Sequence, residues 1–229
     1  MKRIKISLIL NIVNALFVTF AVIAMTSGFH FMSDDTILEL ASLSAFQFFT
    51  FDSNLLLGIV TVMFIAYEIM LIKGKIEKIP RYAYLLKFVS TVAVGLTMFT
   101  VVILLAPQTT KGYFSLFLNA NLFFHLICPL VAIISFCFFE KQNDIKFKEC
   151  VYGLIPTLLY GIYYTINVAI YMENGVVAFE HDWYGFAKGG AIGIALSVIM
   201  MFSGTYLISL LVYFLNKKVL NETIVKNDE

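Results

Sequence analysis

Six long apolar segments follow one another along this 229-residue chain, with only short polar connections between them. Each segment reaches or exceeds the roughly 20 residues that an α-helix needs to cross the hydrocarbon core of a bilayer. The chain is 60% hydrophobic, well above the share in soluble domains. We therefore expect an all-α integral membrane protein that forms a single domain over residues 1–229. Its transmembrane helices are predicted at about residues 6–27, 47–72, 82–106, 115–139, 150–172 and 189–215.

The N-terminal segment could be mistaken for a secretory signal peptide, because Lys2, Arg3 and Lys5 precede its apolar run. That run continues to about Met25, which makes it longer than the roughly 7 to 15 residues of a signal-peptide core. No clear cleavage site follows it. We therefore expect a first span that is retained.

Lysine and arginine are distributed very unevenly between the two sides of the predicted bundle. One side carries 14 of the 16 such residues, Lys87 among them, and the other carries only Lys111 and Lys188. Because Lys and Arg are enriched in cytoplasmic loops, we expect a multi-pass cell-membrane protein with both termini in the cytoplasm. Glu68 and Glu140, near the inner ends of their segments, are expected to be interfacial partners of these lysines.

The charge and cysteine content exclude several other classes of protein. The formal net charge is only +1 and the charges gather between apolar runs, so no nucleic-acid-binding face is predicted. Cys128, Cys137 and Cys150 form no C-x-x-C pair, which argues against a disulfide framework or a zinc site. No glycine-rich phosphate loop or zinc-protease motif is present. We predict neither a metal nor a cofactor.

Polar residues at the start of the second segment are the first candidate site, because polar groups in hydrocarbon are costly. Thr50, Ser53 and Asn54 are spaced i, i+3 and i+4 and so share one face of a helix. Asp52 points about 160° away from Thr50. The hydroxyls can simply bond to carbonyls of their own helix, with Asp52 facing the outer water. The alternative is that this face lines a functional site.

His125 is the only histidine within a predicted span. It lies about 10 residues from the outer end of the predicted helix 115–139, hence about 15 Å deep, with Asn121 one turn above. A neutral imidazole can accept a proton at one nitrogen while donating at the other, as a general base requires. A structural histidine between helices is the alternative. Since Thr50 and His125 both belong to the outer half, folding could bring them together.

Two further groups of polar residues lie in the last third of the chain. Tyr160, Tyr163, Tyr164 and Asn167 are spaced i, i+3, i+4 and i+7, so they form a stripe on one helical face. They either pack and hydrogen-bond or line a cavity for an amphiphile, which can use both the apolar ring and the hydroxyl. In the following loop, Trp183 is expected in an aromatic belt at the outer membrane surface.

The same loop contains Glu180, His181 and Asp182, which are residues of metal-binding type. Three adjacent loop residues are a weak pattern for a metal site. We expect them to be solvated.

Two short motifs are similar to those of a known family: Phe49-Thr50-Phe51-Asp52-Ser53-Asn54-Leu55, and His125-Leu126-Ile127-Cys128-Pro129-Leu130. Trp183-Tyr184-Gly185-Phe186 is a looser match. The chain resembles the androgen-induced and androgen-dependent TFPI-regulating proteins and their bacterial six-span relatives, over almost its whole length.

This resemblance implies an intramembrane threonine hydrolase of a bacterial inner membrane, whose eukaryotic relatives cleave fatty acid esters of hydroxy fatty acids. Thr50 matches the nucleophile and His125 matches the base. The chain departs from the pattern by placing Asp52 and Ser53 directly after this threonine, which makes Ser53 a competing nucleophile.

The leading hypothesis is therefore a lipid ester hydrolase or acyltransferase in which His125 deprotonates Thr50. Asn54 and Asn121 would hold the oxyanion or orient the histidine. A membrane lipid or fatty-acid ester would be the substrate. The alternative is a non-enzymatic substrate-binding or transport subunit, like the six-span capture components of vitamin transporters, whose ligand site would be the outer loops and the 160–167 face. A purely structural membrane protein is the third possibility.

Overall fold

The computed structural model describes residues 2–34, 42–140 and 144–225 of the chain. Six of its helical segments are long and apolar enough to cross a membrane, so the predicted all-α fold with six membrane-length helices is confirmed. The bounds differ from the predicted ones by a few residues in every segment. The observed spans are Lys2–Ser27, Phe49–Ile72, Arg81–Gln108, Ala120–Phe139, Phe147–Ile170 and Phe186–Lys218.

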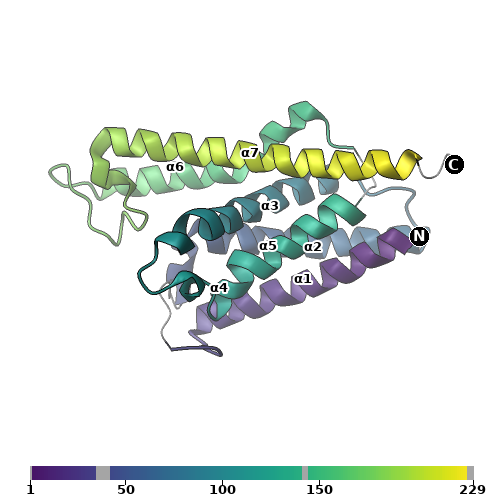
Figure 1. The fold of residues 1–229 in the computed structure, drawn as a ribbon, viewed down its shortest axis with the longest axis horizontal. Helices are drawn as coiled ribbons and strands as arrows, with labels where there is room; N and C mark the ends of the chain where they lie inside the picture. Colours follow the sequence, from purple (N-terminus) through teal and green to yellow (C-terminus); the bar gives the residue numbers. More distant parts are fainter. Residues whose placement is uncertain (1, 35–41, 141–143, 226–229) are drawn as a thin grey trace.

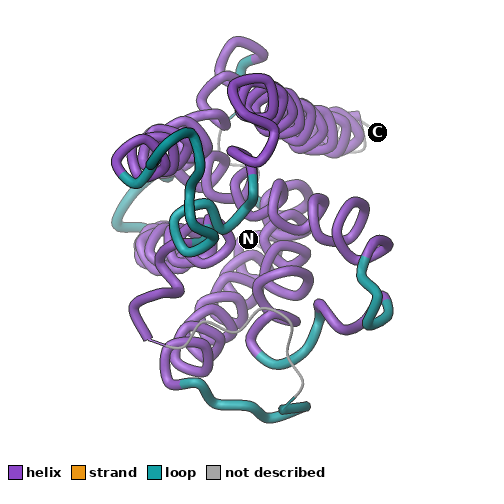
Figure 2. Tube along the Cα trace, turned by 90° about the vertical axis from the view of Figure 1, so that its left-hand side faces the viewer, coloured by secondary structure: helices purple, strands orange, loops and turns teal. Residues whose placement is uncertain are grey.

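The helices form a bundle with an antiparallel pair along one side (Figure 1). The bundle contains α1 (Lys2–Ser27), α2 (Phe49–Ile72), α3 (Arg81–Phe99) and the fourth span. The pair consists of α6 (Ile155–Ile170) and α7 (Gly190–Val225), which follows the short helix η8 (Phe186–Gly189). The N-terminus and the C-terminus lie at the same end of the molecule, here named the termini end. Figure 2 looks onto the opposite end, the loop end.

The third helix, α3, is the centre of the bundle. It begins directly after Pro80, whose fixed φ suits the start of a helix. Every residue from Lys87 to Met98 is buried, so this helix touches protein on all sides. Its buried residues include the hydroxyl side chains of Ser90, Thr91 and Thr97, which must find partners inside the bundle because lipid offers none.

The other three prolines each follow a change of helical type. Proline has no backbone N–H, so the carbonyl four residues earlier loses its α-helical partner and the chain adopts another helical geometry. Pro107 in η3 (Ala106–Gln108) follows the π-helical η2 (Thr100–Leu105), Pro129 in α5 (Cys128–Ile134) follows the π-helical η5 (Phe123–Ile127), and Pro156 in α6 follows the 3₁₀ helix η7 (Phe147–Leu154).

The fourth span is shorter than predicted. It consists of α4 (Ala120–Leu122), η5, α5 and the π-helical η6 (Ser135–Phe139), and the preceding residues form the separate 3₁₀ turn η4 (Tyr113–Leu116). Asn119 interrupts the helix with a positive φ of 53°. Its side chain makes three hydrogen bonds of 2.7 to 2.9 Å with the backbone of residues 31–33. His125 is therefore only five residues from the start of the span and not about 10 as predicted.

The structure also corrects three assignments at the termini end. Lys87, a residue of the predicted helix 82–106 that was counted with the Lys and Arg residues of one side, is completely buried, and Glu68 and Glu140 are each only 1% exposed. They belong to a polar cluster inside the protein between α1, α2, α3 and η6, in which Glu140 Oε1 lies 3.8 Å from Lys87 Nζ. Without Lys87, 13 of the Lys and Arg residues that the sequence assigns to this side remain.

A pair of glycines tests the packing of the sixth span on the fifth. A Cβ atom on Gly153 would lie 2.8 Å from Ser209 Oγ and 3.0 Å from Val92 Cγ1, whereas one on Gly161 would meet nothing within 4 Å. We expect Gly153→Ala to lower the stability of the purified protein by about 1–3 kcal/mol through overpacking. Gly161→Ala is the matched control and should leave the midpoint temperature of thermal unfolding unchanged or raise it. Equal midpoints for the two variants would contradict this packing.

Candidate functional site

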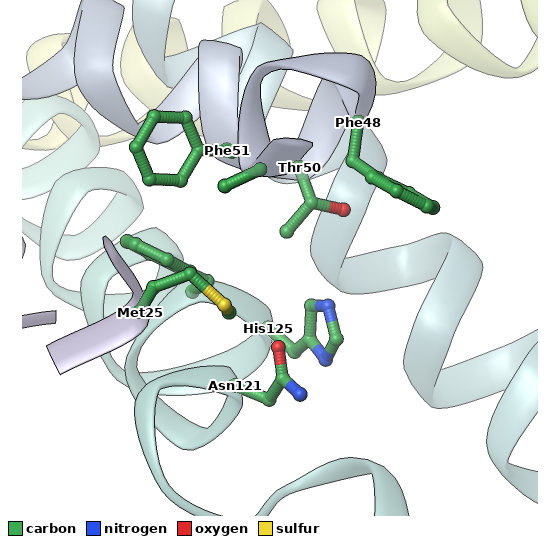
Figure 3. Close-up of a pocket in the computed structure, with 8 residues that line it drawn as sticks. Met25, Phe48, Thr50, Phe51, Asn121 and His125 are labelled. Carbon is green, nitrogen blue, oxygen red and sulfur yellow. The ribbon is translucent and has the colours of Figure 1, made fainter. Parts of the chain in front are cut away.

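Thr50 and His125 line the same small cavity near the loop end of the bundle. Figure 3 shows the two side chains on opposite walls, with the Thr50 hydroxyl turned into the space between them. The cavity measures about 40 Å³, which is room for a few water molecules, so a larger ligand requires side chains to move. The remaining walls come from five mostly apolar positions and one amide: Met25, Ala45, Phe48, Phe51, Phe124 and Asn121.

The hydrogen bond made by His125 determines which of its nitrogens can act as a base. Nδ1 lies 2.9 Å from the carbonyl oxygen of Leu116 in η4. A carbonyl only accepts hydrogen bonds, so Nδ1 carries the proton and the neutral ring keeps a lone pair on Nε2. The side chain is buried, with 2% exposed surface. Leu116 thus orients the imidazole much as a carboxylate does in a catalytic triad.

Thr50 is held by its backbone while its hydroxyl stays available. Its carbonyl accepts hydrogen bonds from Asn54 Nδ2 at 2.8 Å and from Ser53 Oγ at 3.1 Å. Within the described ranges, no protein group hydrogen-bonds to the Thr50 hydroxyl oxygen. Thr50 is also the second residue of α2, where the helix dipole is positive. A developing negative charge on this oxygen would therefore be stabilised.

Asn54 hydrogen-bonds to both sides of the cavity. Its Nδ2 donates to the Thr50 carbonyl and, at 3.2 Å, to the carbonyl of Phe124 in η5. Both of its N–H groups are thus used to tie the start of α2 to the residue next to His125. Asn54 positions the two walls of the cavity and is not available to an oxyanion. Asn121 also lines the cavity, with its amide beside the His125 ring (Figure 3).

Ser53 and Asp52 face a different cavity from the one that contains Thr50. They line a space of about 290 Å³ between α2 and α6, together with residues such as Tyr163. Ser53 Oγ also lies 3.2 Å from Thr97 Oγ1 on α3. The three residues that were predicted to share one face therefore have different surroundings. Thr50 lines the cavity of His125, Ser53 lines the larger cavity, and Asn54 joins α2 to η5.

The aromatic residues of α6 bind the last loop to the bundle. The indole N–H of Trp183 donates to the Tyr160 hydroxyl at 2.9 Å, and Tyr160 in turn donates to the Gln47 carbonyl. Trp183 is only 8% exposed, so most of its surface packs against protein. Tyr163 is 46% exposed and remains beside the larger cavity.

Tyr184 connects this loop to the start of α2. Its hydroxyl oxygen accepts the backbone N–H of Phe49 at 3.1 Å, one residue before Thr50. Desolvation by burial raises the pKa of Tyr184 to about 12, so the phenol stays neutral at ordinary pH. The last loop therefore helps to fix the end of α2 that carries Thr50.

Asp182 was expected to be solvated, but it is buried and anchors the loop. It accepts hydrogen bonds from the Tyr164 hydroxyl and, at 3.1 Å, from the Ala187 backbone N–H, and it is 3% exposed. His181 stacks on a tyrosine ring, and its carbonyl accepts from Asn167 at 2.7 Å. Among the described residues, no three His, Cys, Asp or Glu side chains are grouped so that they could hold a metal ion.

Sequence reasoning missed two sets of positioning residues. One is Asn119, which fixes the entry to the fourth span, and the other is the buried cluster around Lys87 and Asn11. Both could have been found by asking which polar residues interrupt apolar runs, since each such residue needs a partner in the membrane.

Comparison with known proteins adds no relative to this description. No protein-family model matches the chain, no curated protein matches it, and no solved structure matches its fold. The family resemblance stays a prediction that is based on the motifs around Thr50 and His125.

Two neighbouring carboxylates test the anchoring of the last loop. Asp182→Ala removes the acceptor for the Tyr164 hydroxyl and the Ala187 N–H, so we expect it to destabilise the protein by about 1–3 kcal/mol. Glu180→Ala is the control, because the Glu180 side chain is 78% exposed and such changes stay within about 0.5 kcal/mol. Thermal unfolding of both purified variants measures the difference. An Asp182 variant as stable as the control would contradict the anchor.

Proposed function

We propose that the protein is an intramembrane hydrolase or acyltransferase that acts on a lipid ester, with Thr50 as nucleophile and His125 as general base. The single observation that carries this proposal is the shared cavity. His125, with its lone pair on Nε2, and Thr50, whose hydroxyl has no hydrogen-bond partner among the described residues, line the same cavity from opposite walls. Hydroxyl, base and a group that orients the base are the parts of an activated nucleophile.

In the proposed reaction, Nε2 of His125 takes the proton of the Thr50 hydroxyl while Oγ1 attacks the carbonyl carbon of the ester. The negative charge moves to the former carbonyl oxygen. The tetrahedral intermediate then collapses, the C–O bond to the alcohol breaks, and the leaving oxygen takes the proton from His125. Water or a second alcohol, deprotonated by the same nitrogen, releases the acyl group from Thr50.

Two groups could stabilise the oxyanion. The Asn121 amide lines the cavity, and the positive end of the α2 dipole lies at Thr50. The Leu116 carbonyl takes the place that a carboxylate has in a catalytic triad. It keeps the proton of the neutral imidazole on Nδ1, but it adds no negative charge beside the imidazolium. A fatty-acid ester is the expected substrate, since the cavity walls are mainly apolar and the surroundings are hydrocarbon.

The alternative of a ligand-capturing transport subunit has less support. It would use the outer loops and the face of Tyr160, Tyr163, Tyr164 and Asn167. The polar groups of Tyr160, Tyr164 and Asn167 bind the last loop of the chain itself. They are therefore not free to recognise a water-soluble ligand unless the loop opens.

Variants of near-identical shape test the catalytic assignment. Thr50→Val removes only an oxygen that has no protein partner, and His125→Asn keeps an N–H donor for Leu116 but has no basic nitrogen. We expect each to reduce ester turnover and labelling by a fluorophosphonate probe by about 10²–10⁴-fold.

Ser53→Ala is the control for this experiment, because Ser53 lies in the other cavity and should leave labelling within about twofold. Purified variants should unfold near the wild-type temperature. Turnover and labelling that persist in both Thr50→Val and His125→Asn would refute the proposal.

We also propose that both termini are cytoplasmic in a cell membrane, because the sequence assigns 13 Lys and Arg residues at or beyond the ends of the spans to the side of the termini, against Lys111 and Lys188 on the other. Lys75 and Lys111 are exposed and suit cysteine substitution, since the native cysteines are buried. A membrane-impermeant maleimide added to intact cells should label Lys111→Cys and should label Lys75→Cys only after permeabilisation. The reverse pattern would invert the topology.

A further inference from the structure

A second polar site lies at the termini end, separate from the cavity of Thr50 and His125. Asn11 of α1 is its centre and is completely buried. Its Nδ2 donates to Glu68 Oε2 and to Glu140 Oε1, both at 3.1 Å, while its Oδ1 accepts from Lys87 Nζ at 2.7 Å. Four helical spans thus meet at one amide. Such a set of ionisable groups within membrane spans is a functional-site hypothesis by default.

The charges in this cluster do not balance if every group is ionised. Lys87 Nζ lies 3.8 Å from Glu140 Oε1 and donates to Thr61 Oγ1 at 2.9 Å, so one ammonium faces two carboxylates. The two glutamate oxygens share one amide nitrogen and so lie no more than about 6 Å apart, a distance at which like charges repel strongly. A net charge in a buried region is costly. One additional positive charge would restore neutrality.

The polar groups continue one helical turn further from the termini end. Asn14 is i+3 from Asn11 on the same face of α1, and Thr91 is i+4 from Lys87 on α3. Both are at most 1% exposed, and among the described residues neither amide atom of Asn14 nor the Thr91 hydroxyl has a partner. These side chains extend the polar network by one helical turn into the bundle. The apolar cluster of Val18, Leu57, Val94, Cys128 and Ala132 lies beyond them and separates the network from the cavity of His125.

The donors around the cluster favour a proton over a metal cation. Its centre is occupied by N–H groups of Asn11 and Lys87, which would repel a sodium ion. A glutamate that has taken up a proton needs only one further acceptor, for its new O–H group. Ser135 Oγ donates to Glu140 Oε1 at 2.7 Å and so stabilises the ionised form of that residue. The remaining titratable groups nearby are Tyr84 of α3, whose hydroxyl donates to the Glu140 carbonyl, and Cys137 of η6. From α7, the neutral Asn216 faces the same region.

We propose that Glu68 and Glu140 together bind one exchangeable proton, which neutralises the second carboxylate opposite Lys87. A hydronium ion from the solvent at the termini end gives its proton to a carboxylate oxygen and leaves as water. The route is short, because Glu68 lies four residues, or about 6 Å, from the end of α2. The pair titrates as a unit, since both carboxylates share the Asn11 amide.

Infrared difference spectroscopy tests this proposal on the full-length protein in a detergent without ester groups. A protonated carboxylic acid has a carbonyl stretching band that an ionised carboxylate lacks. We expect the wild-type protein to show one such band for a buried acid that disappears when the pH is raised. Glu68→Gln and Glu140→Gln each leave one carboxylate opposite Lys87, so both should lose the band. Glu180→Gln, in the outer loop, is the control and should keep it.

A charge-removing variant gives a positive result that does not depend on loss of a signal. Lys87→Met leaves two carboxylates without an ammonium, so both must be protonated and the band should be about twice as intense. No band in the wild-type protein, or a band that persists in either glutamine variant, would overturn the proposal. Loss of the wild-type band on replacing choline chloride with sodium chloride at constant pH would also overturn it, because the ligand would then be a metal cation. None of these readouts depends on ester turnover.

Discussion

Lipid offers no hydrogen bonds, and most of the polar architecture of this protein follows from that constraint. Every polar side chain and every freed backbone carbonyl in the spans needs a protein partner. Asn54, Asn119 and Asn11 supply many of these partners, and each joins segments that are far apart in sequence. The proline-induced π segments are part of the same pattern, because each leaves a carbonyl that must be satisfied from elsewhere.

The cavity of Thr50 and His125 depends on these connections. Asn54 ties the start of α2 to η5, Leu116 fixes the tautomer of His125, and Tyr184 binds the backbone at Phe49. The Thr50 hydroxyl, in contrast, has no hydrogen-bond partner among the described residues. A nucleophile has to be held in place by hydrogen bonds to its surroundings while its own hydroxyl stays available to react. Thr50 meets both requirements.

The apolar runs were enough to predict the six helices, since length and hydropathy alone decide which segments can span. Pairing of residues across helices could not be predicted in the same way. Helical spacing placed Thr50 and Ser53 on one face, yet α2 is surrounded by protein at this depth, so that face is shared between the fourth span and α6. Lys87, near the start of the predicted helix 82–106, was counted with the Lys and Arg residues of one membrane side because a single charge near a helix end fits the interface equally well.

The central claim is that Thr50 Oγ1 is the atom that forms a covalent bond with the substrate. Peptide mapping by mass spectrometry of the wild-type protein after reaction with a fluorophosphonate locates that bond to one residue. The account predicts a single adduct on Thr50, in the peptide that also contains Ser53, with fragment ions that separate the two positions. An adduct on Ser53, or none on this peptide, would contradict it.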